Sequence, residues 1–248
     1  INISIMSLIL LGGLGFVTWQ DIAKNKGNFH RYRLQSKIIL STTIFLVLLP
    51  ALFYFFVEFR EMPMESRILA SFFTAVTPRT AGFNTVDFSK FSDSGIFLQT
   101  LLMLVGAAPG STGGGMKITT MTVLFLTSVA IFRNNSRTEA FGRTIPGEVI
   151  RNATTIAFMY ICLCVLSGMF ISLHENLPLL TTSFETASAI ATVGLTLGIT
   201  PKLSPVSHVV LISLMYIGRV GGLCLIYAVF PNANPNKGRL VEENVIVG

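Results

Sequence analysis

Two stretches of this chain repeat one another at a constant spacing. Residues 71–84, SFFTAVTPRTAGFN, align without a gap with residues 183–196, SFETASAIATVGLT. Paired residues are 112 positions apart (192 − 80 = 112), and the identical pairs include Ser71 with Ser183, Phe72 with Phe184, Thr74 with Thr186, Thr80 with Thr192 and Gly82 with Gly194. A chain with such a repeat has to fold the same unit twice, and each unit contains a polar Thr-x-Gly element.

The repeat extends beyond these two stretches. Gly106 in MLVGAAPG pairs with Gly218 in MYIGRVGG at the same spacing. A third copy of this element, ILLGGLGF, occupies residues 9–16, where no Thr-x-Gly stretch precedes it. The chain therefore holds the last helix of one unit, followed by two complete units.

The composition places these units in a membrane. Hydrophobic residues make up 51% of the chain, charged residues only 12%, and the mean hydropathy is +0.67. Soluble domains carry about 25% charged residues. Uncharged runs near the roughly 20 residues that cross a bilayer occur at 1–20, 38–57 and 152–173. We predict an all-α polytopic membrane protein. Because Ile1 already lies inside a hydrophobic run, we also expect an N-terminal portion to precede it.

Positive charge gathers in two loops between apolar runs. The basic residues of the first loop are Lys24, Lys26, Arg31, Arg33 and Lys37, and those of the second are Arg133, Arg137, Arg143 and Arg151. This is the pattern of cytoplasmic loops, and it explains the net charge of +6 without a nucleic acid partner. The three cysteines, Cys162, Cys164 and Cys224, lie in apolar segments and are interpreted as small core residues.

With these loops in the cytoplasm, the path of the chain follows. The five predicted spans alternate in direction and cover residues 1–23, 38–58, 96–132, 150–173 and 205–230. Between a rising and a falling span lie residues 65–84 and 178–196, which are too short and too polar to cross. Each is predicted to be a re-entrant loop, with a half-helix going down and extended backbone returning.

The returning backbone carries the Thr-x-Gly elements. Non-helical backbone at membrane depth is tolerated only where protein buries it or where it lines an aqueous cavity. Rings of backbone carbonyls replace the hydration shell of K⁺ in channel filters, and Thr-Val-Gly belongs to such a filter sequence. The predicted K⁺-binding carbonyls are those of Thr80, Ala81, Gly82, Thr192, Val193 and Gly194. A complete ring needs about four such loops, in agreement with an earlier N-terminal portion.

The chain resembles the Trk/Ktr/HKT superfamily of potassium transporters. The resemblance rests on TPRTAGFN, GSTGGGMKITT, ATVGLTLGITP and MYIGRVGGL, and the bacterial Trk and Ktr membrane subunits are most similar. It implies helix–pore loop–helix units around a pseudo-fourfold pore. Residues 1–37 would hold the last helix of a preceding unit and a cytoplasmic loop. Residues 38–147 would form a complete unit with a broken second helix, and 148–248 the final unit and a cytoplasmic tail.

The stretch 96–132 is too long for one straight span. Its 37 residues would reach about 55 Å as a helix, against a hydrocarbon core of about 30 Å. Its middle, residues 106–117, contains Pro109 and several glycines, which are poor helix formers. We predict a break there, and the resemblance implies an intramembrane gate loop. Its predicted residues are Gly110, Gly113, Gly114, Gly115, Lys117 and Arg219. A simple packing bend is the alternative. A Walker A loop is excluded because Met116 separates Gly115 from Lys117.

Three charged residues near the predicted pore are expected to have different roles. Arg219 stands in an apolar helix, where an arginine is costly and usually faces an interior or aqueous path. It is predicted to bind loop carbonyls and hold the loop shut, or simply to satisfy the carbonyls of a broken helix. Arg79 is predicted to pin its loop rather than to contact the ion. Glu185 either raises the local cation concentration or pairs internally, and the sequence leaves both open.

The resulting prediction is the pore-forming subunit of a K⁺ uptake system in a bacterial cell membrane. It is not an enzyme and needs no cofactor, with K⁺ as the transported ion. A Na⁺- or H⁺-coupled symporter is the alternative, disfavoured because the spans offer almost no carboxylates apart from ends such as Asp21 and Glu58. The resemblance further implies a homodimer on a cytosolic nucleotide-binding regulatory ring, docked on the basic loops 24–37 and 133–151, with the lipid bilayer around it.

Overall fold

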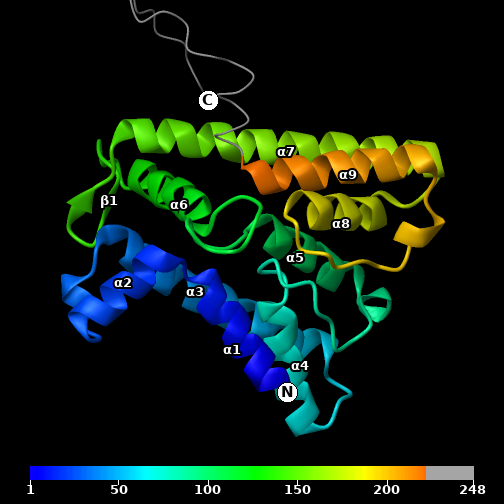
Figure 1. The fold of residues 1–248 in the computed structure, drawn as a ribbon, viewed down its shortest axis with the longest axis horizontal. Coiled ribbons are helices and arrows are strands. Elements are labelled where there is room, and N and C mark those ends of the chain that lie inside the picture. The colour runs from blue at the N-terminus through cyan, green and yellow to red at the C-terminus, as the bar shows by residue number, and fades with distance from the viewer. Residues whose placement is uncertain (222–248) are drawn as a thin grey trace, which may run out of the picture.

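A computed structural model describes residues 1–221 of the chain (Figure 1). Its α-helices are α1 (Asn2–Gly13), α2 (Phe16–Asn25), α3 (Leu34–Phe53), α4 (Met64–Val76), α5 (Asp93–Leu104), α6 (Ile118–Phe132), α7 (Gly147–Glu175), α8 (Leu179–Ile190) and α9 (Pro205–Val220). Short 3-10 helices are η1 (Phe29–Arg31), η3 (Phe88–Lys90) and η4 (Thr200–Lys202), and a π-helical turn, η2 (Tyr54–Glu58), continues α3. This part of the chain is therefore helical throughout, as predicted, apart from one small hairpin.

The hairpin lies in the second basic loop. Its strands, β1 (Glu139–Ala140) and β2 (Arg143–Thr144), pair antiparallel. Phe141 and Gly142 between them both have positive φ, 50° and 73°, which is the backbone that a two-residue hairpin turn requires. The apolar periodicity that predicts helices carries no signal for such a short turn-driven element.

The sequence repeat reappears as a structural repeat. The series α3–α4–η3–α5 is followed by α7–α8–η4–α9, and η3 and η4 are 112 residues apart at both of their ends. In the second series α8 lies against α7 and α9, and Figure 1 shows these helices as one layer with α5 beneath α8. Each series is a long helix, a short helix and a returning helix, so the same order of helices occurs twice in the described residues.

Within residues 1–221, two helices are long and apolar enough to cross a membrane, Leu34–Glu58 and Gly147–Glu175. The sequence predicts a span over residues 1–23, and the structure adds a sharp bend within this stretch. Its helices α1 and α2 meet at an angle of 94°. The turn is made by Gly15, which has a φ of 77°, and the indole Nε1 of Trp19 fixes it by donating to the Leu11 carbonyl at 2.9 Å. Apolar composition alone does not reveal a glycine-dependent bend.

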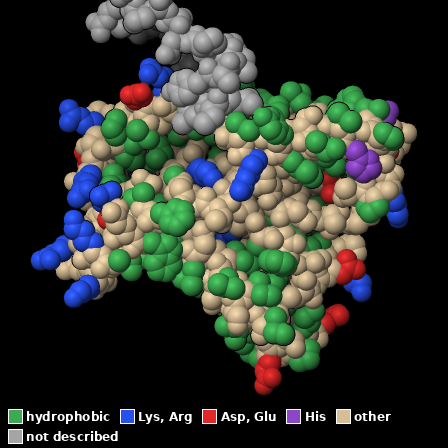
Figure 2. Space-filling view, viewed as in Figure 1, with side chains coloured by type: hydrophobic (Ala, Val, Ile, Leu, Met, Phe, Trp, Pro, Cys, Tyr) green, Lys and Arg blue, Asp and Glu red, His purple; other side chains and the backbone are tan. Residues whose placement is uncertain are grey.

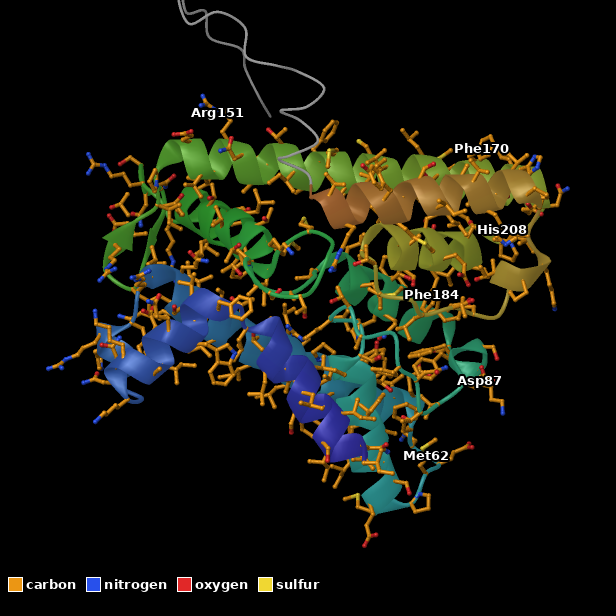
Figure 3. The ribbon with its side chains drawn as sticks, viewed as in Figure 1. Met62, Asp87, Arg151, Phe170, Phe184 and His208 are labelled. Atoms are coloured by element: carbon orange, nitrogen blue, oxygen red, sulfur yellow. The ribbon has the colours of Figure 1, made fainter. Side chains whose placement is uncertain are left out.

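The core of the second unit surrounds α8. Phe184, labelled in Figure 3, is fully buried, and its ring centroid lies 6.1 Å from that of Phe88. Small residues on the same helix, Ala187 and Ala189, let the neighbouring helices approach closely. Cys164 is buried and free, as expected of a small core residue, whereas Cys224 lies outside the described residues.

The two ends of the molecule differ in charge. Figure 2 shows Lys and Arg gathered at the end that carries α2 and the hairpin. Arg151 lies toward that end in Figure 3, whereas His208, Asp87 and Met62 lie at the opposite end. The positive-inside rule predicts that the basic end faces the cytoplasm, so the opposite end, which α7 reaches, is called the outer end.

At the outer end, a carboxylate ties each rising helix to its returning helix. Glu58 accepts hydrogen bonds from the backbone N–H and hydroxyl of Ser92, the N-cap residue of α5. Glu175 accepts the same two from Ser204, the N-cap residue of α9, at 2.9 and 2.5 Å. The two serines are 112 residues apart, so the tie belongs to the repeated unit.

Candidate functional site

The two Thr-x-Gly elements have the same unusual backbone. Thr80 and Thr192 have positive φ, 61° and 55°, and so do Gly82 and Gly194, at 72° and 91°, whereas the residues between them do not. The prediction of simple extended backbone is therefore incomplete, because residues with positive φ alternate with a residue whose φ is not positive. Such alternation turns successive like groups of the backbone to one side. A threonine with positive φ is uncommon, and it occurs here at both equivalent positions.

The two elements lie against each other. A Cβ added to Gly82 would overlap the carbonyl oxygen of Val193 and would lie 3.5 Å from the Cα of Gly194. A Cβ added to Gly194 would meet only the Cα of Gly82, at 3.8 Å. The two backbones therefore pass very close to each other, and this close approach requires a glycine at position 82.

The chain leaving the second element is held by Glu185. This carboxylate is only 4% exposed and accepts hydrogen bonds from the Thr196 hydroxyl, the Leu197 N–H and the Thr200 hydroxyl at 2.6, 2.9 and 2.8 Å. Of the two interpretations that the sequence leaves open for Glu185, the structure shows internal pairing.

Below the elements, the predicted break in the stretch 96–132 is present, since α5 ends at Leu104 and α6 begins at Ile118. The intervening loop closes on itself. The Gly106 N–H donates to the Met116 carbonyl at 2.7 Å, and the Ile118 N–H donates to the Ala107 carbonyl at 3.3 Å. In a continuous helix these N–H and carbonyl groups would bond to one another along the helix. Here some of them form hydrogen bonds within the loop instead.

The glycines of this loop lie directly against the two threonines. A Cβ on Gly113 would lie 2.6 Å from the Thr80 hydroxyl, and one on Gly114 would overlap the Thr192 hydroxyl. A Cβ on Gly115 would lie 3.0 Å from the Cα of Ala191. Three of the predicted gate glycines, Gly113, Gly114 and Gly115, therefore allow the loop to pack beneath both Thr-x-Gly elements. Gly110, by contrast, has open space around it and a φ of 71°.

Two cationic side chains bind carbonyls of the loop. Arg219 Nη1 on α9 donates to the Thr112 carbonyl at 2.8 Å, and Lys117 Nζ donates to the Gly113 carbonyl at 2.5 Å. The backbone of α9 also contributes, since the Gly218 carbonyl accepts from the Gly115 N–H at 3.2 Å. The loop is thus fastened to the returning helix of the second unit.

The first helix fastens the opposite side of the loop. The Gly13 carbonyl accepts from the Ala108 N–H at 3.0 Å, and the Phe16 N–H donates to the Gly110 carbonyl at 3.2 Å. A Cβ on Gly15 would lie 2.5 Å from the Pro109 carbonyl oxygen, so the 94° bend brings this backbone against the loop.

The bend of the first helix has equivalents in the repeat. The alignment of ILLGGLGF, MLVGAAPG and MYIGRVGG pairs Gly15 with Pro109 and Gly221. Helix α1 ends just before Gly15 and α9 just before Gly221, whose φ values are 77° and 90°. The sequence predicts the helix break in the second copy but not in the first and third, although the shared register contains the signal.

A cavity of about 270 Å³ lies beside the first filter element and the loop. The residues that line it are Leu8, Ile9, Gly12, Gly13, Arg79, Thr80, Ala81, Phe83, Ala107, Thr112 and Gly113. Predicted filter and gate residues thus share one cavity wall with the first helix.

Comparison with known proteins identifies a family and several relatives of this chain. The family described as TrkH: Cation transport protein matches residues 1–236. The potassium/sodium uptake protein NtpJ of Enterococcus hirae is 37% identical over 98% of this chain and 56% of its own length. The Ktr system potassium uptake protein B of Bacillus subtilis is 33% identical over 100% of this chain and 57% of its own length.

The same fold is found in a solved structure. The potassium transporter TrkH from Vibrio parahaemolyticus superposes with a TM-score of 0.76 at 19% identity, over 93% of this chain and 52% of that one. The chain thus spans somewhat more than half the length of the relatives it matches. It is a multi-pass membrane protein and belongs to the TrkH cation transport protein family.

Proposed function

We propose that this chain supplies two of the ion-conducting units of a K⁺ uptake protein in the bacterial cell membrane. The observation that carries the proposal is the shared backbone of Thr80–Gly82 and Thr192–Gly194, packed together above a glycine loop. The names of the relatives support potassium as the ion. In this proposal the carbonyls of Thr80, Ala81, Gly82, Thr192, Val193 and Gly194 take the place of water around K⁺.

The loop between α5 and α6 serves as the gate. It lies against the hydroxyls of both filter threonines, so an ion leaving the filter toward the cytoplasm meets it. Lys117 and Arg219 add positive charge at the same level, and this charge disfavours a cation as long as the loop stays in place. For the gate to open, the loop has to break its hydrogen bonds to α1 and α9.

Transport by the purified full-length protein in liposomes tests the proposal. We expect uptake of radioactive Rb⁺ along its gradient, with unlabelled K⁺ competing far better than Na⁺, because the carbonyl sites fit K⁺ and Rb⁺. If Na⁺ competes as well as K⁺, the protein is not selective for K⁺ and this part of the proposal is wrong. If the protein produces no Rb⁺ uptake in liposomes, the proposed transport function is wrong.

A Na⁺- or H⁺-coupled symporter is the second candidate. It is favoured by the printed name of the Enterococcus relative, which includes sodium, and by the burial of Glu185 near the filter. Symport predicts that K⁺ accumulates when only a Na⁺ or proton gradient is imposed. A conduit predicts that K⁺ follows its own electrochemical gradient whatever the other gradients are. Imposing each gradient separately on the same liposomes distinguishes the two.

The assembly forms the last part of the proposal. Two copies of the protein form a homodimer that rests on a cytosolic nucleotide-binding regulatory ring, and the exposed basic loops 24–37 and 133–151 at one end of the molecule are its docking surface. Light scattering of the detergent-solubilised protein measures the dimer. Replacing Arg133, Arg137 and Arg143 with glutamine should weaken binding of a purified ring subunit. Unchanged binding would show that the ring docks on another surface.

A further inference from the structure

Arg79 stands directly before the first filter element and has no equivalent in the second unit. The residue 112 positions later is Ala191. A pore loop of this geometry therefore forms without an arginine at this place. The arginine occurs in the unit that contains the glycine loop between α5 and α6, and we therefore ask whether its role concerns that loop.

The guanidinium of Arg79 is buried without a counter-charge. The residue is 8% exposed, and the one ion pair among the described residues joins Arg33 to Asp21. Its Nη2 reaches the Thr43 carbonyl on α3 at 3.5 Å, and its Nε has no hydrogen-bond partner in the part of the chain described. A buried charge with so few partners is costly, and the fold does not require it, because alanine serves in the second unit.

The surroundings of the guanidinium are the hinge of the loop. It lines a cavity of about 10 Å³ together with Leu10, Gly13, Thr43, Ala107, Ala108 and Ile118. This volume is about the smallest that holds one water molecule, so the unpartnered Nε has room for a bridging water. In the same place the Ala108 N–H binds the Gly13 carbonyl, and the Ile118 N–H binds the Ala107 carbonyl.

One side chain thus connects two parts of the ion pathway. Its backbone is covalently joined to Thr80 of the filter, and its guanidinium lies among the residues at which the loop leaves α5. We propose that Arg79 is a positioning residue that couples the filter segment at Thr80 to the loop hinge at Ala107 and Ala108. The inference rests on the proposed function, since it gives Arg79 a role within that same pathway.

The coupling makes two separate measurements change together. Arg79→Gln removes the charge and most of the donors while roughly keeping the length of the side chain. The filter end is read from the K⁺/Na⁺ preference of uptake in liposomes. The loop end is read from the labelling rate of a cysteine introduced at Ala108, which is 1% exposed, with a water-soluble thiol reagent, in a protein whose native cysteines are replaced by alanine. The second reading does not depend on transport.

Arg67 provides a matched control on α4, the helix that precedes Arg79. It also donates to a backbone carbonyl, that of Phe55, at 2.7 Å, but it does not line the hinge cavity. We expect Arg79→Gln to lower the K⁺/Na⁺ preference and to raise labelling at position 108, each by at least about fivefold, a typical size for coupling between sites. Arg67→Gln should change each by less than about twofold.

A change in only one of the two readings would overturn the coupling, and so would no change in either. If Arg79→Gln does not elute as a folded protein, Arg79→Lys decides in the same way, because lysine keeps the charge but loses the planar fork of donors. Failure of the proposed function looks different: the unmutated protein would then take up no K⁺, while the labelling of position 108 would still report on the hinge.

Discussion

Arg219 on α9 and Thr112 in the glycine loop are 107 residues apart in sequence, yet Nη1 of the arginine donates to the threonine carbonyl at 2.8 Å. If this bond latches the gate, Arg219→Ala should raise K⁺ flux by about fivefold, because a hydrogen bond from a charged group contributes on the order of 1 kcal/mol at an exposed site. Apparent K⁺ affinity should change little, since the filter carbonyls are untouched.

Arg219→Lys should give a flux between those of the wild type and Arg219→Ala. Lysine keeps the charge but presents its donors in a different geometry. K⁺ flux into liposomes, measured for the wild type and both variants, decides whether Arg219 latches the loop. Equal rates would mean that the arginine only satisfies carbonyls at the end of a broken helix.

Substitution of the filter glycines should reveal an asymmetry. Gly82→Ser and Gly194→Ser both place a side chain at a residue with positive φ, but only the first forces its Cβ onto the Val193 carbonyl oxygen. We expect both variants to lose K⁺/Na⁺ preference, with the larger loss for Gly82→Ser. Gly142→Ser is the control, because Gly142 has a φ of 73° and open space around it. Wild-type selectivity in both filter variants would refute the assignment of the filter.

Removal of the loop tests whether it obstructs the pathway. Deleting residues 110–115 joins Pro109 to Met116 and leaves the base of the loop in place, where the Gly106 N–H binds the Met116 carbonyl at 2.7 Å. K⁺ flux should rise and should depend less on the cytosolic partner. A deletion variant that elutes as a folded protein but keeps wild-type flux and regulation would show that the segment is only a packing bend.

Glu185 should tolerate glutamine but not alanine. In Glu185→Gln the new amide oxygen still accepts from the Leu197 N–H and the Thr196 hydroxyl, and the amide nitrogen donates to the Thr200 hydroxyl. Alanine instead leaves a buried N–H unpaired, at a cost of about 1–3 kcal/mol. We therefore expect Glu185→Gln to keep flux within about twofold of the wild type, and Glu185→Ala to lower the melting temperature. A large loss of flux in Glu185→Gln at low ionic strength would instead assign the carboxylate an electrostatic role.

The architecture is predictable from sequence because it depends on features that repeat. The spacing between Thr80 and Thr192, the polarity of the two pore segments and the glycines after Gly106 together indicate the units, the re-entrant loops and the helix break. The positive φ of the two threonines is not predictable, because φ there is imposed by tertiary packing on a residue type that rarely adopts it. The bend at Gly15 escapes prediction for a related reason. It depends on the loop that docks against it, which comes much later in the chain.

Partners that a sequence does not mark at fixed spacing also escape prediction. Glu58 and Ser92 lie 34 residues apart, and neither stands out until the helices are placed. Only the recurrence of Ser92 at Ser204 could have indicated the link. The fastening of the loop by Gly13, Phe16 and Gly218 involves backbone groups, which no residue type reveals.

The link between Glu175 and Ser204 fixes where α9 can pivot. With its outer end held to α7, a rigid motion of α9 is a rotation about that end, and displacement grows with distance from it. The helix is about 24 Å long at 1.5 Å per residue, so a tilt of about 5° carries its inner end about 2 Å sideways. That displacement exceeds what the bond between Arg219 and Thr112 tolerates. A small rotation applied from the cytoplasmic side is therefore enough to release the loop, while the outer face of the protein barely moves.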